Sequence, residues 1–118
     1  MAIRDEIGYT KLTLEIGDWD MNTDFEVDVA HGLSATEWLT IRSVDVIIQN
    51  DSDAVPRFMR PLTGLHNPSL ANERGGVSWI TDTNIRLHRA IGVTPFDDAS
   101  HDLTPFNRGW ITLEYIAD

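Results

Sequence analysis

The sequence predicts an all-β protein, an antiparallel β-sandwich of about 6–7 strands with two long loops. Short segments in which apolar and polar residues alternate recur along the chain, and this alternation is typical of half-buried strands. Clusters of turn-forming residues separate the segments, and no long amphipathic helical pattern lies between them. The length of 118 residues predicts one domain over residues 1–118, with residues 1–8 as a flexible N-terminal segment.

The strongest strand signal is TIRSVDVIIQNDSD, at residues 40–53. It is rich in β-branched residues and ends in a run of polar turn formers. Its alternation places Val44, Val46 and Ile48 on the core face, and Asp45, Ile47 and Gln49 on the other face. Ile47 is apolar where a one-sided strand carries a polar residue. A neighbouring subunit would cover it, although a loop over it or simple exposure explains Ile47 equally well.

Two further strands precede this segment. Residues 9–16 alternate strongly, and residues 24–30 alternate after a stretch rich in turn formers, so the two strands form a hairpin or a corner with Trp19 near its tip. Residues 33–39 predict a single helical or 3₁₀ turn. Ser34 resembles an N-cap there, and Glu37, three positions later, completes a capping box.

The segment at residues 54–62 is apolar, but Pro56 and Pro61 each remove a backbone donor. It can therefore form only an edge strand or an extended crossing segment. Residues 63–76 follow as a long loop that contains three glycines. A loop of this length in a compact domain is often functional.

The C-terminal part of the chain predicts three more strands. Residues 77–81 and 84–89 are short strands on either side of a tight turn, and residues 90–107 form the second long loop. Residues 109–117 carry bulky side chains on both faces. This last strand is expected at the centre of a sheet.

Composition limits the function classes. The chain has no cysteine, which excludes disulfides, thiol catalysis and thiolate metal sites within it. Nineteen acidic against nine basic residues give a formal charge of −10, a field that opposes binding to nucleic acid phosphates. No apolar run approaches the roughly 20 residues that span a bilayer. The N-terminus also lacks a signal-peptide pattern, so we expect a soluble protein made in a cytoplasm, without membrane insertion.

Catalytic and metal-binding patterns are missing from the sequence, so we expect no enzyme, no cofactor and no metal site. The four histidines lack the spacing of a zinc site: His31, His66, His88 and His101. No nucleophile motif or phosphate-binding motif is present either. Acidic residues cluster in turns: Asp18 with Asp20, Asp51 with Asp53, and Asp97 with Asp98 and Asp102. A glycosidase pair is one interpretation of such acids. Capping and solvation of turns is the stronger one.

Aromatic residues near polar loops suggest a ligand site. An aromatic ring beside hydrogen-bonding side chains can stack on a sugar and contact its hydroxyls. Trp79 and Trp110 lie inside predicted strands, so we expect them to pack in the core or in an interface. The candidates for a glycan site are Trp19, His66, Asn67, Asn72, Arg74 and Asp82.

An ordered set of motifs carries a family resemblance. These are IGDWDM (16–21), HGLS (31–34), IRSVDVIIQND (41–51), GGVSWITDTNIRL (75–87) and NRGWITLEYI (107–116). Together they resemble a family of small virion proteins of tailed or related bacteriophages, whose members are similar to β-sandwich domains of phage fibres and to H-type lectin domains. The resemblance covers roughly residues 9–117.

This resemblance implies a non-enzymatic virion component, in a fibre or elsewhere on the surface, that is commonly trimeric and adheres to host glycans. The chain has no fibre shaft, coiled coil or glycine repeat, so a fibre tip of this kind must dock to another virion protein. The alternative is a purely structural capsid or tail decoration or assembly protein without a ligand. For the expected homotrimer, Ile47 and Ile116 are the candidate interface residues, since both lie on outer strand faces.

Overall fold

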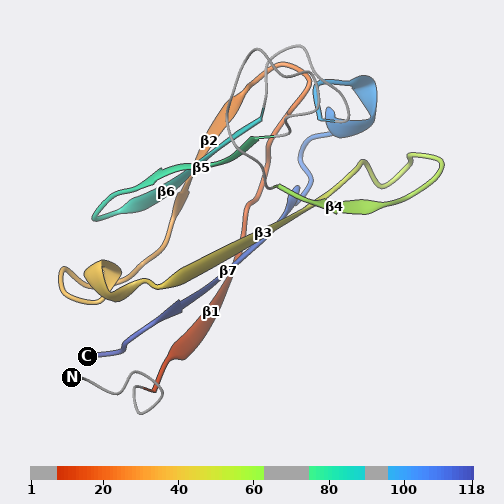
Figure 1. Cartoon of the computed structure of the whole chain (residues 1–118). Helices are drawn as coiled ribbons and strands as arrows, with labels where there is room; N and C mark the ends of the chain where they lie inside the picture. The colour runs from red at the N-terminus through yellow and green to blue at the C-terminus, as the bar shows by residue number, and fades with distance from the viewer. Residues whose placement is uncertain (1–7, 63–74, 90–95) are drawn as a thin grey trace.

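The computed structural model describes residues 8–62, 75–89 and 96–118. Over these residues it is all-β, with seven strands in two antiparallel sheets, which confirms the predicted fold class. One sheet has the strand order β1-β7-β3-β4 and the other β2-β6-β5, and they form separate layers (Figure 1). The apolar faces of both layers meet to form the core.

The four-stranded sheet consists of β1 (Thr10–Glu15), β7 (Gly109–Tyr115), β3 (Ser43–Gln49) and β4 (Met59–Pro61). The C-terminal strand β7 pairs with β1 on one side and with β3 on the other, so its predicted central position is confirmed. The segment with the two prolines supplies β4, which pairs only with β3 at the edge of this sheet. The prolines therefore lie where missing backbone donors are tolerated.

The three-stranded sheet consists of β2 (Glu26–Ala30), β6 (Asn84–Arg89) and β5 (Gly75–Ile80). A shift in register between Val77 and Trp79 interrupts the pairing of β5 with β6. Since β1 and β2 belong to different sheets, the chain between them forms a corner and not a hairpin.

The inner faces of the central strands form the core, as the alternation of β3 predicts. Val46 is 3% exposed and Ile48 is fully buried, whereas Ile47 on the opposite face is 37% exposed. Other buried apolar side chains are Ile16, Trp19, Met21, Val29, Leu62, Ile85, Leu87, Phe96, Ile111 and Leu113. Burial of this set is the main favourable contribution to folding.

Among the described residues, two 3₁₀ turns lie between the strands, η2 (Trp38–Thr40) and η3 (Ala99–His101). The predicted capping box precedes η2: the Ser34 N–H donates to Glu37 Oε1 at 3.0 Å, and the Glu37 N–H donates to Ser34 Oγ at 3.1 Å. Asp98 caps η3 by accepting from the Ser100 N–H at 3.1 Å. Both caps satisfy backbone donors that a short turn leaves unpaired.

Gly109 marks a close approach of β7 to β3. A Cβ atom at this position would lie 2.0 Å from the carbonyl oxygen of Ile47. Only glycine therefore fits where β7 begins.

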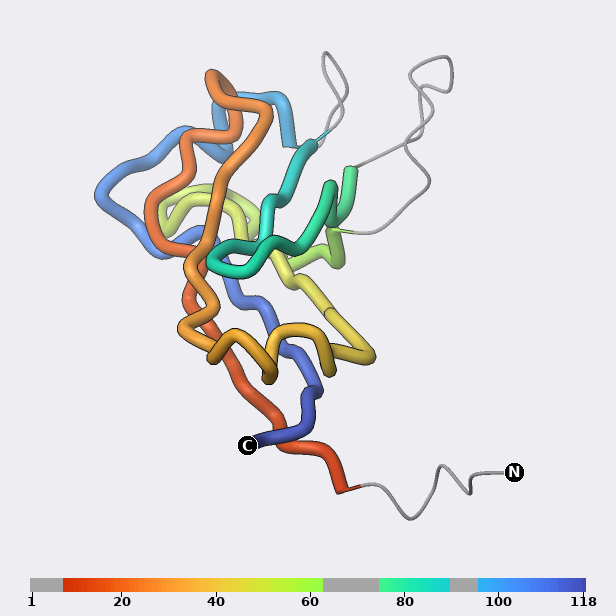
Figure 2. Tube along the Cα trace, turned by 90° about the vertical axis from the view of Figure 1, so that its left-hand side faces the viewer, coloured from red at the N-terminus to blue at the C-terminus, as the bar shows by residue number. Residues whose placement is uncertain are grey.

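The beginning of β1 and the end of the chain lie together. Thr10 pairs with Tyr115, and Figure 2 shows the C-terminus beside the first described residues of β1. Parts of both predicted long loops, residues 63–74 and 90–95, lie outside the described residues, as do residues 1–7. Within the described part of the chain, no helix is long and apolar enough to cross a membrane.

Candidate functional site

An exposed tryptophan lies on the outer face of the β2-β6-β5 sheet. Trp79 is 51% exposed, so of the two predicted environments, core or interface, the core is wrong. Simple alternation puts Val77 and Trp79 on one face, but β5 changes register between them. Val77 therefore faces Leu87 in the core layer, while Trp79 pairs with Arg86 on the outer face. A bulge often redirects a side chain in this way.

Arg86 fixes the position of the indole ring. Its guanidinium carbon lies 4.5 Å from the centroid of the Trp79 ring, within the range of a cation–π contact. Its Nε donates to Asp28 Oδ1 at 2.7 Å, and one terminal nitrogen donates to Asp28 Oδ2 at 3.0 Å. The other terminal nitrogen is 3.9 Å from Glu26 Oε2. We call Glu26, Asp28, Trp79 and Arg86 the Trp79 platform.

The charges of the platform are locally matched. The hydrogen bond from Arg86 holds the pKa of Asp28 below its ordinary value, and the same bond raises the pKa of Arg86. Both groups therefore stay ionised near neutral pH. Two of the three guanidinium nitrogens donate to Asp28, and this bidentate contact fixes the orientation of the guanidinium. Arg86 therefore acts chiefly as a rigid support for the Trp79 ring.

Two carboxylates lie on the same sheet face as the indole, on β2, with Arg86 of β6 between them and the ring. The side chains of Asp28 and Glu26 are 41% and 38% exposed, so their carboxylates face solvent beside the platform. In the next row His88 lies opposite Glu26 in register, and its Nδ1 is 2.7 Å from Ser78 Oγ. An apolar ring next to exposed carboxylates suits a ligand with one apolar face and several hydroxyl donors.

A second polar cluster lies between loops, and it is closed. Arg108 is fully buried and one of its terminal nitrogens lies 2.9 Å from Asp51 Oδ1. Asp51 also accepts from the backbone N–H groups of Asp102 and Leu103, at 3.3 Å and 3.1 Å. Burial by itself would raise the pKa of Asp51, but the bonds from Leu103 and Arg108 outweigh it and lower that pKa. The pair anchors the loops, as the turn-capping interpretation of these acids predicts.

His101 lies beside this cluster without forming a catalytic triad. Its Nδ1 is 2.7 Å from Asp98 Oδ1 and 3.1 Å from Ser100 Oγ. In a Ser-His-Asp triad the serine and the acid contact different ring nitrogens. Here both lie at the same nitrogen, while Nε2 is buried and has no hydrogen-bond partner among the described residues. An adjacent hollow of about 300 Å³ is lined by turn residues that include Asn50, Asp53 and Ser100.

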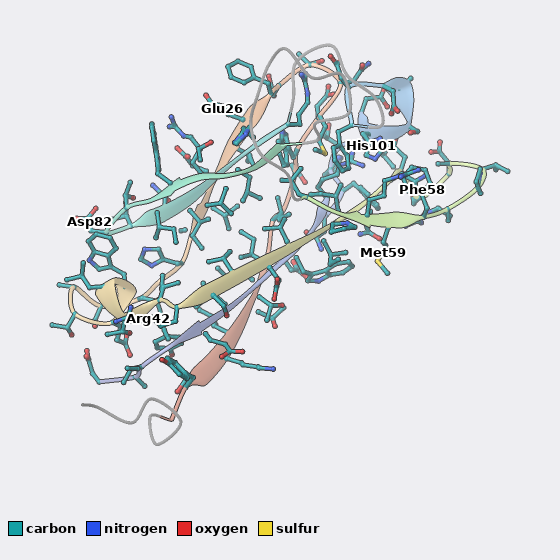
Figure 3. All side chains as sticks on the ribbon, in the orientation of Figure 1. Glu26, Arg42, Phe58, Met59, Asp82 and His101 are labelled. Carbon is teal, nitrogen blue, oxygen red and sulfur yellow. The ribbon has the colours of Figure 1, made fainter. Side chains whose placement is uncertain are left out.

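The structure separates two of the residues predicted for a glycan site. Trp19 is 2% exposed, and its Nε1 donates to the carbonyl of Asp24 at 2.9 Å, so its ring offers no face to a ligand. Asp82 is exposed in the turn between β5 and β6, and Figure 3 shows it at the other end of β2 from Glu26. The hydrogen bond from Trp19 to Asp24 places Trp19 near the Glu26 end. The remaining candidates lie outside the described residues: His66, Asn67, Asn72 and Arg74.

The two predicted interface residues lie far apart along the four-stranded sheet. Ile47 lies opposite Trp110 in register, and Ile116 follows Trp110 by six positions along the chain. Six residues of strand span about 20 Å. Ile116 is half-buried, and its N–H donates to Thr40 Oγ1 at 2.8 Å.

Sequence reasoning missed Trp79 and Arg86 as a pair. The position of Trp79 inside a strand predicts packing in the core or an interface, and its contact with Arg86 depends on strand register, which alternation alone does not give. The pair Gly75-Gly76 just before it is the available signal, since glycine inside a strand often marks a bulge.

Comparison with known proteins gave no match: no family model, no curated protein and no solved structure is similar to the chain.

Proposed function

We propose that the chain is a non-enzymatic component of a bacteriophage virion, at a fibre or elsewhere on the surface, and that it binds host glycans through the Trp79 platform. The motif resemblance and the β-sandwich support the first part of this proposal. The exposed, supported indole supports the second. The proposal includes assembly as a homotrimer, docking to another virion protein, and synthesis in the host bacterial cytoplasm.

The single observation that carries the binding role is the exposure of Trp79. Half of this large ring faces water on an otherwise polar sheet face. Keeping an apolar side chain of this size exposed forgoes about 25 cal/mol for each Å² of apolar surface left unburied. Arg86 and Asp28 nevertheless hold the ring in one position. A rigid aromatic surface of this kind loses little conformational entropy when a ligand stacks on it.

The chemistry of the platform favours a sugar over other ligands of similar size. The C–H face of a pyranose can stack on the indole, while its hydroxyl groups donate to the carboxylates of Asp28 and Glu26. Anionic ligands are disfavoured by these two carboxylates and by the overall charge of −10. We therefore expect a neutral or amino-bearing glycan.

A glycan array tests this proposal, with Trp79→Ala compared with the wild type. We expect reproducible binding to at least one neutral or amino-bearing glycan class and at least a tenfold loss in Trp79→Ala, since loss of a stacking contact of about 1.4 kcal/mol or more has that effect. Tyr9→Ala is the control, because Tyr9 is also an exposed aromatic residue, at 38%, but lies next to β1 in the other sheet.

Equal losses in the two variants would contradict a role for the platform. Silence on the array, together with stable association with a virion structural protein, would favour the purely structural decoration role. The exposed apolar surface on the outer face of the four-stranded sheet favours this decoration role.

A further inference from the structure

The outer face of the four-stranded sheet carries a continuous apolar patch. Trp110 on β7 lies opposite Ile47 on β3, and Ile47 lies opposite Pro61 on β4. Met59 occupies the next row of β4 and is 62% exposed. We call Ile47, Met59, Pro61 and Trp110 the β4 patch. It crosses three neighbouring strands, so it is about 10 Å wide between the outer strands.

One arginine borders this patch without a carboxylate partner. Within residues 8–62, 75–89 and 96–118, Arg57 makes no ion pair. Its terminal nitrogen donates to Gln49 Oε1 at 2.9 Å, and Gln49 lies opposite Met59 in register. By contrast, Arg86, Arg89 and Arg108 each contact a carboxylate.

Arg57 and the patch form one surface at the β3–β4 connection. A shallow hollow of about 290 Å³ is lined by Gln49, Arg57, Phe58 and Met59. Figure 3 shows Met59 on the opposite side of β4 from His101, and thus on the side away from the buried cluster. An apolar centre with arginine at its rim is the usual composition of a protein interface.

We infer that the β4 patch is the surface on which a second copy of this chain docks, and this inference rests on the homotrimer proposed above. Charge complementarity is the reason for choosing a second copy. The chain has 19 acidic and 9 basic residues, so the surface of another copy is predominantly acidic and suits Arg57. The patch then supplies the apolar part of the contact.

The contact is made by side chains and not by strand addition. The free edge of β4 is short, with three residues, and one of them is Pro61, which has no N–H to donate. The basic, apolar surface of one copy therefore meets a different, acidic surface of the next. Such a head-to-tail contact forms a ring when its rotation closes, and three copies close the proposed trimer.

Sedimentation velocity over a concentration series tests this inference, with Met59→Glu as the principal variant. We expect the wild type to have the mass of three chains, and Met59→Glu to need at least tenfold higher concentration to reach it. Leu39→Glu is the matched control, because Leu39 is also 62% exposed but follows Trp38 in η2. Leu39→Glu should assemble as the wild type does.

Arg57→Glu provides a second variant that leaves every apolar side chain in place. We expect it to weaken the trimer as well, since it replaces a cation at the rim with a charge that repels an acidic neighbour. At a concentration low enough for the wild type to dissociate too, the variants should have the thermal unfolding curve of the wild type, which would show that their subunits fold normally.

Wild-type mass near one chain at all concentrations would overturn both the trimer and this interface. If the trimers of Met59→Glu and Arg57→Glu are as stable as the trimer of Leu39→Glu, the proposed interface is wrong but the trimer itself stands. A two-chain species that depends on Met59 would overturn the head-to-tail ring. Glycan binding is measured in a separate experiment that compares the wild type with Trp79→Ala. Failure of the interface and failure of the ligand site therefore remain distinguishable.

Discussion

At the scale of single residues, His101 is the most constrained titratable side chain of the described chain. It is fully buried and lies between Phe58 and Phe96, with ring centroids at 5.7 Å and 5.4 Å. Donation from its Nδ1 to Asp98 identifies the neutral tautomer with the proton on Nδ1. Nε2 is then an acceptor without a hydrogen, which explains why it can lie among aromatic rings without a partner.

This environment predicts a pH-dependent stability. Burial lowers the pKa of His101, more strongly than the nearby Asp98 raises it. An unfolded histidine has a pKa of about 6.5. Below that pH the unfolded chain binds a proton that the folded chain does not, so the free energy of unfolding decreases as the pH falls, by at most about 1.4 kcal/mol per pH unit for one group.

Urea unfolding of the wild type and of His101→Gln between pH 7 and 5 measures this effect. We expect the wild type to lose stability across this range and the variant to lose less. The lowered pKa values of Asp51 and Asp98 act in the same direction, but only nearer the pKa of an unfolded aspartate, about 3.9. Equal slopes for the two proteins would contradict the assignment to His101.

Two tryptophans show what the sequence does not reveal about single residues. Trp19 lies in a polar turn-like stretch and yet is buried, because its ring packs into the core and its Nε1 reaches a carbonyl. Trp79 lies in an apolar strand and yet is exposed, because of the shift in register of β5. Local polarity predicts exposure only when the register of the strand is known.

At the scale of the elements, β3 provides the strictest test of the predicted faces. Val46 is 3% exposed and lies on the core side of the strand. We expect Val46→Asp to abolish soluble folding, because an unpaired buried carboxylate costs several kcal/mol against a total stability of about 5–15 kcal/mol. Ile47→Lys, at the next position but 37% exposed, should leave the subunit folded.

Expression yield in the soluble fraction and thermal unfolding distinguish these two variants. Soluble Val46→Asp protein with the wild-type melting temperature would mean that the side chains of β3 face the opposite way.

The elements themselves were largely predictable from the sequence, because alternation is a local property of a strand. Residues 84–89 form β6 as predicted, and the proline-containing segment forms the edge strand β4. The pairing of strands was not predictable in the same way. The pairing of β7 with β1 and β3, and that of β6 with β2, joins segments that lie far apart in the chain and depends on tertiary contacts. The Trp79 platform depends on the order β2-β6-β5 and on the register shift in β5, and so could not be assembled in advance.

At the scale of the whole molecule, the Arg108 side chain connects three separate segments at one end of the sandwich. Its Nε donates to the carbonyl of Trp19 at 3.0 Å, and its terminal nitrogens donate to the carbonyls of Gln49 and Leu103, at 3.1 Å and 3.2 Å. The ion pair with Asp51 completes the set. One guanidinium thus holds the β1–β2 corner, the end of β3 and the chain before β7 together.

We therefore predict a global loss of stability in Arg108→Met. The methionine fills much of the same volume, but it leaves the nearly buried carboxylate of Asp51 without its counter-charge, and breaking a buried pair in this way costs about 3–5 kcal/mol. Urea unfolding should show this decrease as a lower midpoint of one cooperative transition, because the three segments belong to the same core. Arg42→Met is the control, since Arg42 is exposed and its guanidinium donates to the carbonyls of Leu39 and Ile41.

The double variant Arg108→Met, Asp51→Leu should recover part of the lost stability, because it removes the unpaired carboxylate. A single Arg108→Met variant as stable as Arg42→Met would show that the guanidinium does not hold these segments together.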